Sequence, residues 1–84
     1  MSDMPAWRVY IVRCKGGSLY TGISTDVAAR LRKHNAGKGA RSTRGRTWVL
    51  LYSERCASKR HAMSREWHLK RDRNFRKKLA LKIK

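Results

Sequence analysis

Acidic residues are scarce in this 84-residue chain. Five Asp and Glu stand against 22 Lys and Arg, which gives a formal net charge of +17 at pH 7. Solubility alone would be served by a surface of mixed sign. An excess of this size instead indicates a polyanionic partner, of which nucleic acid is the commonest. A charged surface with no partner is the alternative.

Long hydrophobic runs are also lacking, and no apolar stretch approaches the roughly 18–20 residues of a membrane span. Residues 1–5 have neither the basic segment nor the apolar segment of a secretory signal. We therefore expect a cytoplasmic protein that meets membranes at most as an anionic surface. Hydrophobic residues still make up 40% of the chain, which is enough for one core. We expect a single domain over residues 1–84.

Cysteine is used only twice, at Cys14 and Cys56, without the paired spacing of a metal-binding motif. Two partly buried thiols are the simplest interpretation for an intracellular chain. A structural disulfide is the alternative. A zinc site is disfavoured because its other ligands would have to come from scattered residues.

The positive charge is concentrated in the second half of the chain. Residues 1–37 hold six Lys and Arg against two acids, whereas residues 38–84 hold sixteen against three. No repeat or low-complexity linker separates the halves, so the gradient belongs to one folded unit. We expect basic residues of the second half to follow a phosphate backbone, in particular Lys38, Arg41, Arg44, Arg46, Lys70 and Arg71.

Three segments have the composition of β-strands. Residues 7–14 and 19–24 are rich in β-branched and aromatic side chains, and the Gly-Gly turn between them predicts a hairpin. Residues 48–52 form a nearly continuous apolar run, which predicts a third strand covered on both faces. Trp48 in this run is either a core residue or a stacking platform for unpaired bases.

Three helices are expected between and after these strands. Thr25 or Asp26 can cap a helix over 27–36, and Ser58 can cap a helix that runs to about residue 71. A last helix over 74–82 would dock on the core through Phe75, Leu79 and Ile83. The order ββαβαα predicts an α+β fold, with a small antiparallel sheet flanked by helices.

Tyr10 and Tyr20 are the first candidate functional pair. They lie in the two strands of the predicted hairpin, far enough from its turn to be neighbours across it. Both are even-numbered, so their phenols can share one face of the sheet if the turn sets that register. An ordinary aromatic cross-strand pair is the alternative.

Arg30 and His34 are the second candidate pair. They are four residues apart on the first predicted helix, hence on one face and within reach of Tyr20. Arginine can hold a phosphate bidentately, and histidine can accept or relay a proton near neutral pH. A solvated helix face is the alternative.

Glu66 is the third candidate, because acids are rare and Asp26 is expected to serve as a cap. Its carboxylate lies on or beside the apolar stripe of the second helix. A hard cation such as Mg²⁺ needs at least one carboxylate and takes water and substrate phosphate at its other positions. An exposed ion pair with Lys70 is the alternative.

Together these residues resemble the GIY-YIG nuclease module. The resemblance rests on Val9-Tyr10-Ile11 and Leu19-Tyr20-Thr21-Gly22-Ile23, followed by Asp26, Arg30 and His34, and extends to Glu66. It is closest to the small stand-alone bacterial subfamily, the YhbQ-like proteins, whose loop is similar to residues 34–44. It covers essentially the whole chain.

The resemblance implies a three-stranded antiparallel sheet flanked by helices and cleavage of a DNA phosphodiester with one divalent cation, Mg²⁺ or Mn²⁺. It also implies roles for five residues: Tyr10 and Tyr20 as the motif tyrosines, Arg30 as the phosphate-binding arginine, His34 as the helix histidine and Glu66 as the metal ligand.

The chain departs from the family pattern at three places. Arg8 and Thr21 replace motif residues whose side chains the family chemistry does not use. Residues 23–25 contain no lysine where some relatives have one. Asn74 is either the asparagine that some relatives use after the glutamate or a cap of the last helix.

On these grounds we expect a metal-dependent DNA endonuclease of low sequence specificity, since no helix-turn-helix, zinc finger or coiled coil offers base readout. Single-stranded or structured DNA is at least as plausible a substrate as duplex. A tyrosine acting as the base would need its pKa of about 10 depressed by the surrounding cations. The rival hypotheses are a non-catalytic nucleic-acid binder with the nuclease fold and a ribosome-associated basic protein. No obligate protein partner is expected.

Overall fold

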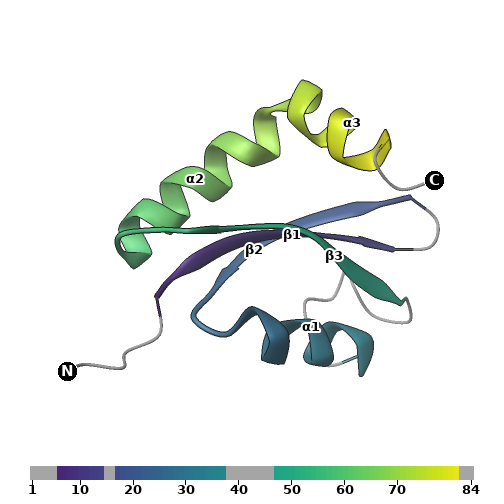
Figure 1. Ribbon diagram of the computed structural model, residues 1–84, viewed down its shortest axis with the longest axis horizontal. Coiled ribbons are helices and arrows are strands. Elements are labelled where there is room, and N and C mark those ends of the chain that lie inside the picture. Colours follow the sequence, from purple (N-terminus) through teal and green to yellow (C-terminus); the bar gives the residue numbers. More distant parts are fainter. Residues whose placement is uncertain (1–5, 15–16, 38–46, 82–84) are drawn as a thin grey trace.

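The computed structural model describes residues 6–14, 17–37 and 47–81. Its elements follow the order β1 (Arg8–Cys14), β2 (Leu19–Ser24), α1 (Val27–Asn35), β3 (Trp48–Arg55), α2 (Lys59–Arg71) and α3 (Arg73–Leu81). This is the predicted ββαβαα order, and the α+β class is confirmed. Figure 1 shows the sheet between two layers, with α1 on one face and α2 and α3 on the other.

The sheet is three-stranded and antiparallel, with the order β2-β1-β3. The central strand β1 therefore contributes to both faces, and its side chains alternate between them. Val9 and Ile11 join the core under α2 and α3. Tyr10 and Val12 join a second cluster, with Leu31 of α1 packed against it. One strand thus separates the larger core from the smaller cluster beneath α1.

Short polar side chains begin all three helices, since the first turn of a helix leaves backbone N–H groups without partners. Asp26 accepts a hydrogen bond from the Ala29 N–H, and Ser58 accepts one from the His61 N–H, as two of the predicted caps require. Of the two alternatives for Asn74, the cap of the last helix is excluded. Asp72 accepts from the Phe75 N–H, and the helix begins at residue 73.

The expectation that β3 is covered on both faces is also wrong. Val49 is 49% exposed and Leu50 43% exposed, because β3 is an edge strand. The strand also extends three residues past the predicted end. Its polar residues 53–55 continue the ladder with β1, beyond an irregularity between Ile11 and Val12. An apolar run in sequence does not distinguish an edge strand from a central one.

Some of the remaining expectations about the core concern described residues, and others fall outside them. Cys14 and Cys56 are both buried thiols, as predicted. Leu79 is buried and Phe75 packs against the same core, whereas Ile83 and the loop 38–46 lie outside the described residues. Within the described part of the chain, no helix is long and apolar enough to cross a membrane.

Candidate active site

Tyr10 and Gly22 are paired across the β1–β2 ladder, and their pairing creates the floor of the candidate site. The Tyr10 ring lies over Gly22 so closely that a Cβ at Gly22 would be 2.7 Å from the Tyr10 hydroxyl oxygen and 2.9 Å from its Cζ. Only a residue without a side chain fits beneath the ring. The sequence motif contained Gly22, but its close contact with Tyr10 could not be inferred without the register.

The Tyr10 hydroxyl is a hydrogen-bond partner of His34 Nε2 at 2.9 Å, across 24 residues of sequence. Both side chains are essentially inaccessible to solvent. Tyr20 is opposite Val12 and therefore diagonal to Tyr10 on the same face. Its ring centroid lies 6.4 Å from that of Tyr10 and 5.0 Å from that of His34. The two tyrosines and the histidine thus form one aromatic cluster beneath α1.

Asn35 fixes the end of α1 that carries His34. Its Oδ1 accepts a hydrogen bond from the Trp48 N–H at 2.6 Å, and its Nδ2 donates to the Trp48 carbonyl at 3.1 Å. Trp48 itself is 3% exposed and packs edge-on against Tyr20. Trp48 is therefore a core residue. Asn35 was missed by sequence reasoning because nothing local signals a bond across thirteen residues.

The charges of Arg30 on α1 and Glu66 on α2 both influence the pKa of the Tyr10 hydroxyl. Burial is the main cause that raises the pKa of Tyr10 to about 12. The Tyr20 phenol and the Glu66 carboxylate act in the same direction, and the Arg30 guanidinium opposes them. The expectation that the cationic surroundings depress this pKa is wrong for Tyr10, because local burial outweighs the net charge.

The pKa of His34 is also shifted by burial, in the direction that favours the uncharged form. Burial, followed by the positive charge of Arg30, holds the pKa of its imidazole below the usual 6.5. At neutral pH the imidazole is therefore neutral and Tyr10 is a protonated phenol. The hydrogen bond between the Tyr10 hydroxyl and His34 Nε2 therefore joins two uncharged groups.

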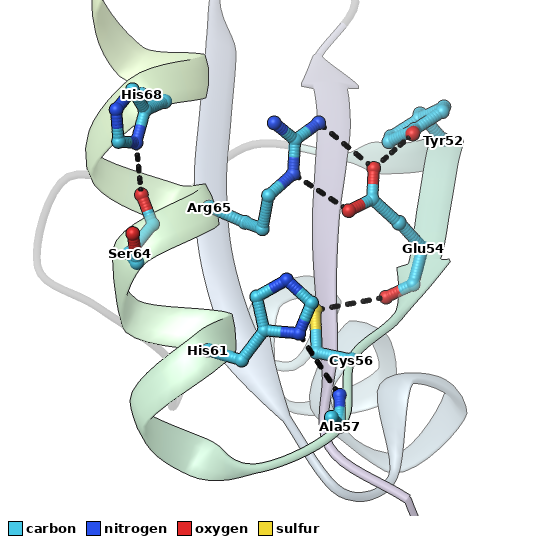
Figure 2. Close-up of polar contacts among 8 residues, drawn as sticks. All are labelled: Tyr52, Glu54, Cys56, Ala57, His61, Ser64, Arg65 and His68. Atoms are coloured by element: carbon cyan, nitrogen blue, oxygen red, sulfur yellow. Dashed lines mark hydrogen bonds and ion pairs between the residues drawn. The ribbon is translucent and has the colours of Figure 1, made fainter.

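An ion pair one residue before Glu66 connects α2 to β3 (Figure 2). Arg65 donates from Nε to Glu54 Oε2 at 2.7 Å and from its second terminal nitrogen to Oε1 at 2.9 Å. The Tyr52 hydroxyl also donates to Glu54 Oε1, at 2.5 Å. The bidentate geometry lowers the pKa of Glu54 through its bonds to Arg65. It links α2 to β3, and Glu66 lies about 100° further around the helix.

The described carboxylates differ in what they do. Asp26 and Asp72 cap helices, and Glu54 is bound by Arg65 and Tyr52. Glu66 is three-quarters buried and has one ion pair, to Lys70 Nζ at 3.4 Å. Among the described residues, no three His, Cys, Asp or Glu side chains come together as a metal cage. A divalent cation fits here only as one that takes a single carboxylate and completes its coordination with water and phosphate.

An open pocket of about 400 Å³ lies beside Arg30, where β2 meets α1 and the beginning of α2. Basic side chains from two helices enter it, Arg30 and Lys33 from α1 and Lys59 from α2. Lys59 Nζ also stands 5.3 Å from the centre of the Trp7 ring. The pocket is large enough for a phosphate and part of a sugar.

The other predicted residues lie elsewhere. Asn74 lines a separate depression with Leu19, at the opposite end of β2 from this pocket. Lys70 and Arg71 are exposed on α2. The positions of Lys38, Arg41, Arg44 and Arg46 are outside the described residues.

The chain belongs to the GIY-YIG catalytic domain family, which it matches over residues 6–79, and the family is a nuclease superfamily. The resemblance inferred from the tyrosine motifs is thereby confirmed. Two relatives named as UPF0213 proteins illustrate the likeness. The chain is 47% identical to a UPF0213 protein of Desulfotalea psychrophila, over 96% of this chain and 76% of the relative. It is 59% identical to a UPF0213 protein of Streptococcus sanguinis, over 69% of this chain and 68% of that protein.

A solved structure supports the same grouping. The solution NMR structure of a UPF0213 protein from Bacillus halodurans is 42% identical in sequence, with a TM-score of 0.53. The match covers 92% of this chain and 84% of the other. The likeness therefore extends to sequence, fold and size.

Proposed function

We propose that this protein is a metal-dependent DNA endonuclease of low sequence specificity that hydrolyses a phosphodiester at the cluster around Tyr10. The observation that carries the proposal is that side chains of two helices, α1 and α2, act on one hydroxyl of β1, that of Tyr10. His34 Nε2 lies 2.9 Å from it, and the charges of Arg30 and Glu66 both act on it. A purely structural aromatic cluster needs neither the guanidinium nor the carboxylate.

Substrate binding begins with the phosphate. Arg30, at the border of the basic pocket, neutralises the non-bridging oxygens of the scissile phosphate. Lys33 and Lys59 in the same pocket bind a neighbouring phosphate. Glu66 would hold the divalent cation, which supplies charge stabilisation for the leaving 3′-oxygen.

The proton of the attacking water needs an acceptor. Tyr10 keeps its own proton at neutral pH, because its pKa is raised to about 12. Tyr10 is therefore not the group that accepts the water proton. Tyr20 is half-buried and packs on the neutral His34 ring. Tyr20, acting as a phenolate whose own proton has passed to solvent, accepts the proton of the attacking water. The bond between the water oxygen and phosphorus forms, the bond between phosphorus and the 3′-oxygen breaks, and the 3′-oxygen takes a proton from solvent.

The test is incubation with labelled single-stranded and double-stranded DNA in Mg²⁺, in Mn²⁺ and in EDTA. Wild type should cut only with metal. Glu66→Gln should lose at least a hundred-fold in rate while keeping DNA affinity, since one buried catalytic contact is worth that much. Asp72→Asn is the matched control. It removes the same charge, but Asn is an equally good cap, so cleavage should be unchanged.

Tyr20→Phe should also abolish cleavage and leave DNA affinity nearly intact. Undiminished turnover in that variant would exclude Tyr20 as the base. Retained binding without metal-dependent cutting of any substrate would favour the non-catalytic binder. Preference for RNA together with indifference to Glu66→Ala would favour the ribosome-associated alternative.

A further inference from the structure

The outer flank of α2 carries the two most exposed large apolar side chains that the structure describes. Met63 is 53% exposed and Trp67 is 54% exposed, four residues apart and hence on neighbouring turns. Burial of an indole is worth more than that of most side chains, so an indole left half in water indicates a surface that contacts something else.

Trp67 is held in place rather than free to rotate. The Arg71 guanidinium carbon lies 3.8 Å from the centre of its ring, and the same side chain donates to the Trp67 carbonyl at 3.3 Å. The His68 ring packs edge-on at 5.0 Å. The guanidinium covers one face of the indole, so the ring is pre-organised as a flat, cation-backed surface.

Trp67 also lies on the flank of α2 that carries Glu66. Successive residues of a helix are about 100° apart around its axis, which places Trp67 further from the core than Glu66. Lys70 and Met63 lie at angles between these two residues. Arg65 lies on the opposite flank, where it binds Glu54. A strand bound at Glu66 and leaving the sheet past α2 would therefore reach the ring of Trp67.

We propose that Trp67, backed by Arg71, is a stacking platform for an unpaired base next to the cleaved phosphodiester, so that the protein favours single-stranded nucleic acid. The proposal rests on the proposed nuclease function for its substrate class. Charge complementarity supports it, since Lys70 and Arg71 flank the indole in a chain of net charge +17. Stacking needs no base identity, because every base has a π-face.

The experiment is a binding measurement by fluorescence anisotropy in EDTA, which separates binding from cleavage. Labelled oligo(dT) and a duplex with the same number of phosphates are compared for wild type, Trp67→Ala, Trp67→Phe and Met63→Ala. Met63 is the matched control because its exposure is close to that of Trp67 and it lies on the same flank, without a ring.

Trp67→Ala should weaken oligo(dT) binding by between about five-fold and a hundred-fold. Duplex binding should change by less than about two-fold, because paired bases are stacked on one another. Trp67→Phe should recover most of the affinity, and Met63→Ala should lose little. The salt dependence should be the same in all variants, because no cation is removed.

Equal losses of affinity for single strand and duplex in Trp67→Ala, or no loss for either, would contradict the stacking role of Trp67. So would a dimer of the wild type that Trp67→Ala dissociates, since the surface would then be a contact between two copies. Failure of the nuclease proposal would give a different experimental result. In that case Trp67→Ala would still lose affinity for the single strand, but wild type would cut nothing in Mg²⁺ or Mn²⁺.

Discussion

The Tyr10 ring lies across Gly22, so close that a methyl group on Gly22 would collide with the phenol. The hydroxyl cannot move aside cheaply, because it is buried and is the hydrogen-bond partner of His34. The absence of a side chain at Gly22 of β2 is thus required for the contact between Tyr10 of β1 and His34 of α1.

Gly22→Ala should destabilise the protein by about 1–3 kcal/mol, the usual cost of forcing extra volume into a packed site. It should also lower cleavage, since the Tyr10 hydroxyl would leave His34. Urea unfolding and a cleavage assay measure the two effects. Ser53→Ala, at an exposed partner of Tyr10 on β3, should change stability by no more than about 0.5 kcal/mol. Unchanged stability in Gly22→Ala would contradict the close packing.

Tyr10→Phe leaves His34 Nε2 without its phenol and should cost about 1–3 kcal/mol at pH 7. Because burial raises the folded pKa of Tyr10 from 10.0 to about 12, its contribution is fully present below pH 10 and is lost as pH rises toward 12. The difference between wild type and variant should therefore be constant from pH 7 to 9 and shrink above pH 10. Tyr52→Phe keeps the Tyr10–His34 pair and should retain full cleavage.

The Glu54 carboxylate should make the free energy of unfolding depend on pH in the acidic range. Arg65 holds its folded pKa below the ordinary 4.5, so the stabilisation is present above that pH and is lost as pH falls through the folded value. The wild type should exceed Glu54→Gln by on the order of 1 kcal/mol at pH 7, since the pair is partly exposed. Thermal unfolding over a series of pH values from 7 down into the acid range compares the two. A difference that does not shrink as the pH falls would show that the ion pair is not its source.

Lys70 is exposed beside Glu66 and is expected to contact the nucleic-acid backbone. Lys70→Gln should lower the steepness of the log–log dependence of DNA affinity on salt by about 0.7–0.9, the contribution of one phosphate contact. Titrations at several salt concentrations measure the slope. Ser64→Ala changes an exposed, uncharged residue of the same helix and should leave the slope unchanged.

The order of elements, the caps at Asp26 and Ser58 and the shared face of Tyr10 and Tyr20 could all be predicted from the sequence, because they depend on local chemistry and on strand alternation. The exposure of Val49 and Leu50 could not, since it depends on which strand lies at the sheet's edge. The raised pKa of Tyr10 was missed for a similar reason. Net charge is a property of composition, but burial of one phenol depends on packing.

The hairpin places Tyr20 on the face of Tyr10 because a fixed number of residues separates their strands. A single inserted residue between Cys14 and Leu19 would direct Tyr20 to the opposite face, among the residues beneath α2. Substitutions in that turn would leave this relation untouched. Across evolution, we therefore expect relatives to vary in the composition of the turn far more readily than in its length.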